Sequence, residues 1–335
     1  MRLKEALEVD DLTVRFVGDE RPVVRGVTFT IAPGEAFGLV GESGSGKSLT
    51  CRAILRLLPR GATATGRITY GSRSLFALSD NAMQALRGSS IAMVFQDPLT
   101  ALNPVLRVGD AIAQVIQSHG RLSLRAARMR AIEMMGRVGI PDAGRRATAY
   151  PHEFSGGMRQ RIHIAMALAA RPTLLLADEP TTALDVIVQA EILRLLDKLR
   201  REEGMSLLLV SHDLRVVAGL CDRVGVMYAG ELVEVGQTRV VLRRPEHPYT
   251  IGLMNSLPEA VVGDRLRAVP GVPPDPAHLP RGCAFAPRCE LARDTCTAGP
   301  IAMEEASSGH SARCIRRDQL DELRRSLVTA SRVGA

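Results

Sequence analysis

The residues that most clearly predict chemistry form the sequence GESGSGKS, Gly41–Ser48. This sequence matches the pattern G-x-x-x-x-G-K-[ST], with the apolar run AFGLV before it and a helical pattern, Ser48–Leu58, after it. Such glycines allow backbone N–H groups to turn inward around phosphate oxygens, and the helix start adds the positive end of its dipole. The alternative, a glycine-rich turn with an unrelated lysine, does not explain the flanking strand and helix. The residues expected to bind the nucleotide here are Gly41, Glu42, Ser43, Gly44, Ser45, Gly46, Lys47, Ser48 and Leu49.

Polar side chains also end three other apolar runs that are typical of buried strands. In LLLADEP, Asp178 can reach Mg²⁺ through water and Glu179 can polarise an attacking water, whereas a helix N-cap explains only one of the two acids. His212 ends SLLLVSH and can donate a hydrogen bond to a γ-phosphate, although a histidine at a strand end is often structural. Gln96 ends IAMVFQ, where it could sense phosphate and metal. We therefore expect Ser48, Gln96 and Asp178 around Mg²⁺.

A second segment, FSGGMRQRIHIAMALAA, also predicts an anion site. Ser155, Gly156 and Gly157 stand at the exposed N-terminal end of the expected helix. The residues expected on its apolar face are Met158, Ile162, Ala165, Met166 and Ala169. Ser-Gly-Gly alone is also compatible with an ordinary helix cap. Because this segment is separate from Gly41–Ser48, we infer that it serves the nucleotide of a partner chain.

The elements that must position these residues follow an α/β pattern. Alternating strands fill the first quarter, and the later buried-strand runs follow helical stretches, which predicts a parallel sheet. Between residues 97 and 171 the strand signal gives way to helical periodicity, so this stretch is expected to be a helical insertion. The segment 245–300 holds 10 of the 19 prolines and predicts an irregular extension.

Composition excludes several classes of protein. No run of about 18 apolar residues occurs, and the N-terminus has no apolar core of the signal-peptide kind, so we expect neither a membrane span nor export. The formal net charge is +7, but the basic residues are spread along the chain. With 3% aromatic residues and no Trp, nucleic acid is not an expected partner.

Together, these ordered motifs resemble the ATP-binding cassette (ABC) family of transport ATPases. FSGGM is similar to the LSGGQ signature, with Phe154 and Met158 as departures, and TALD ends in the D-loop residue Asp185. The resemblance also identifies Gln96 with the Q-loop glutamine and Phe16, in LTVRF, with the aromatic residue that stacks on adenine. It implies a head-to-tail dimer of cassettes, in which each ATP lies between one P-loop and the other cassette's signature helix.

Four longer stretches, QDPLTALNPVLRVGDAI, EPTTALDVIVQAEIL, HPYT and RGCAFAPRC, resemble the ATPases of dipeptide, oligopeptide and nickel importers. This resemblance implies an ATP hydrolase at the cytoplasmic face of the membrane. It would act with a second ABC subunit, two transmembrane permease subunits and an extracytoplasmic substrate-binding protein. The expected domains are a cassette over 1–240, with its helical subdomain at about 97–171, and an extension over 241–335.

Two other functions stay open at this point. A nickel-chelate or other small-solute importer is one, although nickel-type ATPases tend to lack so long an extension. A soluble ABC protein acting on ribosomes or DNA is the other, although such proteins usually carry two cassettes in one chain or a long coiled-coil insertion.

Four late cysteines have the spacing C-x5-C-x6-C-x17-C. In a reducing compartment, clustered thiols indicate metal more than disulfides. The resemblance to peptide-importer ATPases suggests a [4Fe-4S] cluster, with structural zinc and unligated thiols as alternatives. The residues concerned are Cys283, Cys289, Cys296 and Cys314.

Overall fold

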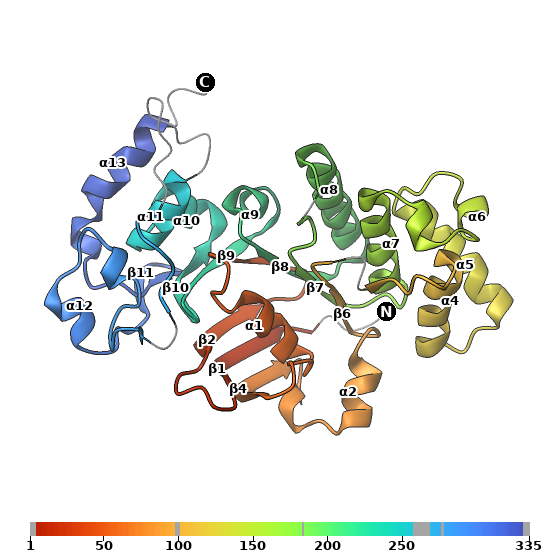
Figure 1. Cartoon of the computed structure of the whole chain (residues 1–335), viewed down its shortest axis with the longest axis horizontal. Helices are drawn as coiled ribbons and strands as arrows, with labels where there is room; N and C mark the ends of the chain where they lie inside the picture. Colours follow the sequence, from red (N-terminus) through yellow and green to blue (C-terminus); the bar gives the residue numbers. More distant parts are fainter. Residues whose placement is uncertain (1–4, 98–100, 183, 257–268, 276–277, 331–335) are drawn as a thin grey trace. The chain divides into compact units, whose positions relative to one another are not determined.

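The computed structural model describes residues 5–97, 101–182, 184–256, 269–275 and 278–330 (Figure 1). By its internal contacts the chain divides into two compact units, each drawn from several stretches of sequence. The unit formed by residues 1–7, 31–36 and 69–210 is called the helical unit, and the unit formed by 8–30, 37–68 and 211–335 is called the P-loop unit. The predicted boundary at residue 240 stays a prediction.

The P-loop unit contains two groups of strands. In the first, β2, β1 and β4 lie side by side, and β1 alternates buried and exposed residues along most of its length, as predicted for the first quarter of the chain. In the second, β3 pairs in parallel with β9, which forms a hairpin with β10. Its main elements up to residue 255 are β1 (Leu7–Phe16), β2 (Val24–Ile31), β3 (Ala36–Val40), α1 (Lys47–Ile54), β4 (Ala62–Tyr70), α9 (Leu214–Leu220), β9 (Arg223–Tyr228), β10 (Glu231–Gln237), α10 (Thr238–Arg243) and α11 (Pro248–Asn255).

The helix after the glycine-rich loop is shorter than the sequence pattern predicts. Helix α1 ends at Ile54 rather than at Leu58. The backbone leaves the helical conformation there, and Arg56 takes a left-handed φ of 52°.

The C-terminal extension contributes two short strands, which lie beyond the proline-rich segment 245–300. Strand β12 pairs antiparallel with β10, with Glu234 opposite Ala312, and β11 pairs with β12. Its elements are the 3₁₀ helices at Ala286–Arg288 and Arg317–Gln319, α12 (Asp294–Ala298), β11 (Glu304–Ser307), β12 (His310–Ala312) and α13 (Leu320–Ala330). The extension therefore continues a sheet of the cassette.

In the helical unit, all described elements between β6 and β7 are helical, and the predicted bounds of the insertion at about 97 and 171 stay a prediction. Strands β6, β7 and β8 form a parallel array in the order β8-β7-β6, and α4, α5, α6 and α7 lie together (Figure 1). Its elements are β5 (Arg73–Ser74), the 3₁₀ helix Leu75–Ala77, α2 (Asp80–Leu86), β6 (Ile91–Val94), α4 (Val108–His119), α5 (Leu124–Arg137), α6 (Ala143–Arg146), the 3₁₀ helix Pro151–Glu153, α7 (Gly156–Leu168), β7 (Leu174–Asp178), α8 (Val186–Glu203) and β8 (Ser206–Ser211).

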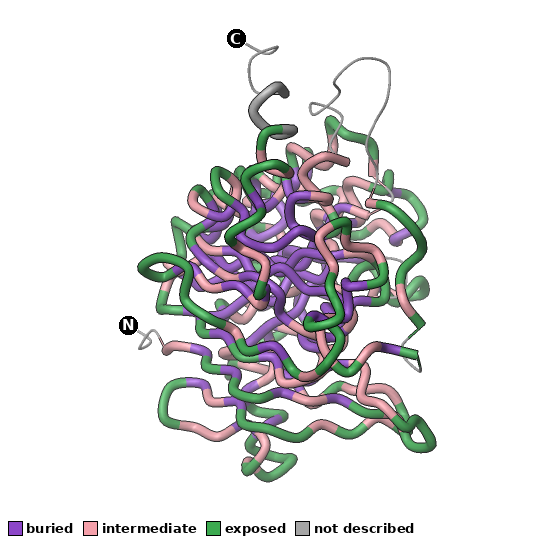
Figure 2. Tube along the Cα trace, turned by 90° about the vertical axis from the view of Figure 1, so that its left-hand side faces the viewer, coloured by how far each residue is buried: buried purple, intermediate pink, exposed green. Residues whose placement is uncertain are grey.

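The parallel strands supply the core of their units. Every residue of β3, β7 and β8 is buried, and buried residues are purple in Figure 2. Two buried faces explain why these strands read as continuous apolar runs rather than as alternating ones. Among the described residues, the helices include none with the length and apolar character needed to cross a membrane.

Candidate functional site

The glycine-rich loop between β3 and α1 folds around its own lysine. The Lys47 side chain is buried, and its ammonium donates hydrogen bonds of 2.8 Å to the carbonyl oxygens of both Gly41 and Glu42. A third contact, of 3.3 Å, joins it to Ser45 Oγ. Gly46 has a φ of 98°, a conformation that L side chains rarely adopt. This geometry fits a phosphate-binding loop, with the Lys47 ammonium already inside the loop.

Glu42 contacts two residues of the C-terminal extension, which the sequence analysis did not predict. Its backbone N–H donates to Tyr249 Oη at 2.8 Å, and its carboxylate pairs with the Arg288 guanidinium. Tyr249 lies in HPYT and Arg288 in RGCAFAPRC. Both stretches resemble importer ATPases, but neither residue was a predicted site residue. The predicted contact of Glu42 with nucleotide stays a prediction.

A pocket of about 240 Å³ lies beside this loop within the P-loop unit. One wall comes from the loop and its neighbouring strands, and another from Pro273, Pro274 and Leu279 of the extension. Phe16, the predicted adenine-stacking residue, ends β1 and is half-buried.

In the helical unit, the structure brings Gln96 and Glu179 together. Gln96 Nε2 donates to Glu179 Oε2 at 3.3 Å, and Thr182 Oγ1 donates to the same oxygen at 2.8 Å. The Glu179 backbone has a left-handed φ of 46°, and its N–H bonds Val210 O at 3.1 Å. Asp178, the last residue of β7, is buried. Two side chains therefore hold the Glu179 carboxylate. Gln96 is one of the predicted site residues, and Thr182 is not.

His212 follows β8, and its predicted phosphate contact stays a prediction. The residue is exposed and directly precedes Asp213, which caps α9 by accepting from the Arg215 N–H at 2.8 Å. His212 belongs to the P-loop unit, whereas Gln96 and Glu179 belong to the helical unit.

The predicted signature helix begins as expected. Ser155 is the N-cap of α7, and its side chain accepts from the Met158 N–H at 3.4 Å. A Cβ at Gly157 would lie 2.7 Å from Val188 Cγ1 of α8, so close packing requires glycine there. Asp185 caps α8 by accepting from the Val188 N–H at 3.0 Å, and its predicted nucleotide contact stays a prediction.

The predicted apolar face of α7 is only part of what the helix buries. Ile162 and Ala165 are fully buried as expected, but Met158, Met166 and Ala169 are only half-buried. Four residues outside the predicted face are also buried: Gln160, His163, Ile164 and Leu168. Helix α7 contacts α4, α5, α8 and β6, so one face does not describe its packing.

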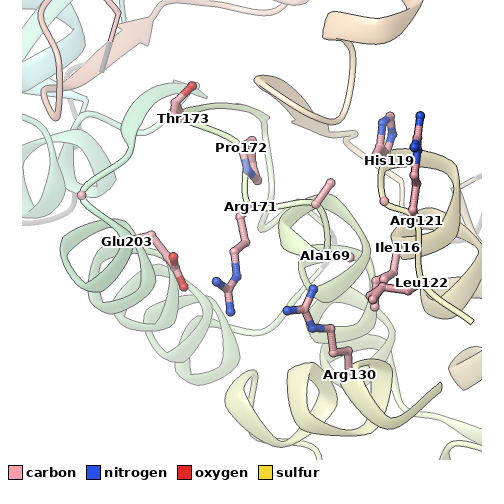
Figure 3. Close-up of a pocket in the computed structure, with 13 residues that line it drawn as sticks. Ile116, His119, Arg121, Leu122, Arg130, Ala169, Arg171, Pro172, Thr173 and Glu203 are labelled. Carbon is pink, nitrogen blue, oxygen red and sulfur yellow. The ribbon is translucent and has the colours of Figure 1, made fainter. Parts of the chain in front are cut away.

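A larger pocket, of about 650 Å³, lies elsewhere in the helical unit (Figure 3). Residues around the ends of α4 and α8, the segment before β7 and Arg130 of α5 line it, and Arg121 and Arg171 are two further arginines among them. None of the predicted site residues lines this pocket.

The four extension cysteines are free thiols. Burial, with a smaller contribution from nearby cysteines, raises the pKa of Cys283 to about 11 and that of Cys314 to about 12. Across the part of the chain that the structure describes, no group of three or more His, Cys, Asp or Glu side chains is arranged to hold a metal ion. This geometry gives no support for the iron–sulfur cluster, which stays a hypothesis.

Comparisons with known proteins agree with this arrangement of motifs. Residues 24–182 match the family described as "ABC transporter", and residues 233–296 match "Oligopeptide/dipeptide transporter, C-terminal region". The chain is 46% identical over 313 residues to the oligopeptide transport ATP-binding protein OppD of Salmonella typhimurium, covering 92% of this chain and 93% of that protein. It is 45% identical over 325 residues to the dipeptide transport ATP-binding protein DppD of Bacillus subtilis, covering 96% and 97%. The chain belongs to the oligopeptide/dipeptide family of ABC transporter ATP-binding proteins.

The fold of this ABC ATPase is also that of solved cassettes. The ATP-binding cassette MJ0796, in a dimeric post-hydrolysis state bound to ADP and Pi, is 30% identical with a TM-score of 0.62, over 70% of this chain and 99% of that one. The predicted α/β cassette fold, ABC ATPase activity and peptide-importer family are thus confirmed. Binding of ATP and Mg²⁺ is typical of such cassettes.

Proposed function

We propose that this ABC ATPase holds Mg·ATP at Gly41–Ser48 and hydrolyses it with the help of Glu179 to drive peptide import. The observation that carries this proposal is the buried Lys47 ammonium, which lies 2.8 Å from two carbonyl oxygens of its own glycine-rich loop. A buried cation surrounded by loop carbonyls is suited to meet phosphate oxygens. Ser48, Gln96 and Asp178 would hold Mg²⁺, which neutralises charge on the phosphates.

Glu179 is proposed to orient the water that attacks the γ-phosphate in line. Its hydrogen bonds from Gln96 and Thr182 hold one carboxylate oxygen in place, which fixes the side chain. His212 is proposed to donate to the γ-phosphate.

A second cassette is proposed to complete the site. The capped, exposed start of α7, with Ser155 and Gly156, offers backbone N–H groups to the nucleotide of a partner cassette. Two transmembrane permease subunits and an extracytoplasmic binding protein would complete the importer, with this subunit at the cytoplasmic face of the membrane. The relatives named for oligopeptide and dipeptide transport favour peptides over nickel chelates.

The variant Glu179→Gln tests the catalytic proposal. We expect ATP hydrolysis to fall at least about 100-fold, because the amide orients the attacking water poorly, whereas Mg·ATP still binds. Steady-state phosphate release and nucleotide titration measure the two properties. The control is Glu133→Gln, an exposed acid of α5. Retained hydrolysis in the Glu179 variant would contradict the assigned role.

Copurification from gently solubilised host membranes tests the partners. We expect two polytopic subunits and a substrate-binding protein. Ribosomal proteins or nucleic acid instead would contradict the proposed partners. Iron and acid-labile sulfide assays on anaerobically purified chain would test the cluster hypothesis.

A further inference from the structure

Arg288 of the C-terminal extension reaches the phosphate loop, 246 residues earlier in the chain. Its Nη1 lies 2.7 Å from Glu42 Oε2, and its Nη2 lies 3.0 Å from Glu42 Oε1. The guanidinium and the carboxylate thus form a bidentate pair, the strongest arrangement of these two groups. The Arg288 side chain is only 6% exposed and that of Glu42 23%, so water screens this pair weakly.

The extension and strand β9 hold Arg288 in one position. Its Nε donates to Pro270 O at 2.6 Å, and its guanidinium carbon lies 5.8 Å from the ring centroids of both Tyr228 and Phe285. These two rings meet edge to face with their centroids 5.2 Å apart. Because every part of the guanidinium is engaged, Arg288 can hold Glu42 in one rotamer.

A second contact fixes the backbone at the same residue. The Glu42 N–H donates to Tyr249 Oη at 2.8 Å, and Tyr249 is fully buried against Tyr228, with their ring centroids 4.6 Å apart. Burial raises the pKa of Tyr249, so its hydroxyl stays protonated. The Glu42 carbonyl in turn accepts from Lys47. The extension is therefore connected through one residue to the lysine of the loop.

The charges explain why this connection matters for the reaction. Glu42 places a carboxylate in the loop that is proposed to receive polyphosphate, and a carboxylate close to phosphate repels it. Arg288 neutralises that carboxylate from outside the loop.

We propose that Arg288 is a positioning residue for nucleotide binding, through which the C-terminal extension sets the ATP affinity of the cassette. It acts by holding and neutralising Glu42 rather than by touching the nucleotide. This inference rests on the proposed binding of nucleotide by Gly41–Ser48.

The test compares Arg288→Gln, Glu42→Gln and the double variant in the full-length chain. Binding of Mg·ADP and Mg·ATP is titrated at low and high salt, and kcat and KM for ATP are measured. We expect Arg288→Gln to weaken binding of both nucleotides about tenfold or more, since the partner charge is left unpaired. The KM should rise with a much smaller change in kcat, and the loss should shrink at high salt.

The double variant separates a charge effect from a structural one. With both charges removed, we expect affinity to return to within about threefold of the original chain. Glu42→Gln alone should bind at low salt more tightly than the original chain, because the Arg288 charge then acts on the phosphates unopposed. Arg293→Gln, an exposed arginine of the same extension, is the matched control.

Other results would contradict either the role of Arg288 or the proposed function. Equal affinity of Arg288→Gln and the original chain would overturn the inference, as would a double variant as weak as the single one. Should Arg288→Gln fail to fold in a thermal unfolding scan, the Glu42→Gln variant decides alone, and weaker binding there overturns the inference. If the original chain itself binds no nucleotide, the proposed function fails instead.

Discussion

At the scale of single residues, His163 is an imidazole placed in the interior of the helical unit. The residue is 4% exposed, and its ring stacks on Phe95, the residue before Gln96, with centroids 6.1 Å apart and planes 6° apart. Burial lowers the pKa of His163 to about 4, although Asp97 opposes this shift. The histidine therefore packs as a neutral ring behind the predicted sensor of phosphate and metal.

This burial makes a prediction about pH. The unfolded chain binds a proton at His163 below about pH 6.5, and the folded chain binds one only below about 4. As the pH falls through this window, the free energy of unfolding decreases, by up to about 3 kcal/mol at the lower end of the window. His163→Phe should keep the stack and remove this part of the pH dependence, measured by denaturant unfolding from pH 7 to 4.5. The exposed His152→Gln is the control, and an unchanged slope in His163→Phe would contradict the prediction.

At the scale of elements, close packing of α7 against α8 fixes the proposed anion-binding helix start. The Gly157 backbone approaches Val188 so closely that no Cβ fits without movement. Gly136 of α5 differs, because a Cβ there would meet nothing within 4 Å. Packing does not require glycine at that position.

The two glycines make a matched pair of variants. Gly157→Ala should destabilise the chain by about 1–3 kcal/mol, because overpacking displaces the helix start. ATP hydrolysis should also fall, since the displaced N–H groups no longer match the partner's nucleotide. Gly136→Ala should be neutral or stabilising by up to about 1 kcal/mol, because the site is exposed and helical. Thermal unfolding and phosphate release measure both, and equal behaviour of the two variants would refute the packing argument.

At the scale of the whole molecule, a buried carboxylate joins the extension to the cassette within the P-loop unit. Glu234 of β10 is fully buried and accepts hydrogen bonds from the Glu246 N–H at 2.7 Å, the His247 N–H at 3.1 Å and His310 Nε2 at 2.8 Å. His310 begins β12 and His247 caps α11, so one side chain ties three elements together.

We expect Glu234→Gln to cost about 2–4 kcal/mol of stability, because an amide places its own N–H groups against buried donors. The extension should then be cleaved faster in limited proteolysis and nucleotide affinity should fall, since Arg288 and Tyr249 lose their support. Glu304→Gln, on the exposed strand β11, is the control. If denaturant unfolding and proteolysis of the two variants coincide, Glu234 does not hold the extension.

The sequence by itself determined the local parts of this protein. The P-loop, the buried strands, the capped start of α7 and the ABC family are readable because glycine conformations, apolar runs and helix caps depend on residues close together in the chain. The short strands β11 and β12 were not readable, because four exposed residues and three further ones form a ladder only where β10 offers β12 a partner.

Only the tertiary structure decided which distant residues meet. Gln96 and Glu179 are 83 positions apart, and Glu42 and Arg288 are 246 apart. No local pattern encodes either pair, because each depends on how separate strands and loops are brought together by packing. The spacing of the four late cysteines likewise does not specify how their sulfur atoms approach one another, so their predicted metal site stays a prediction.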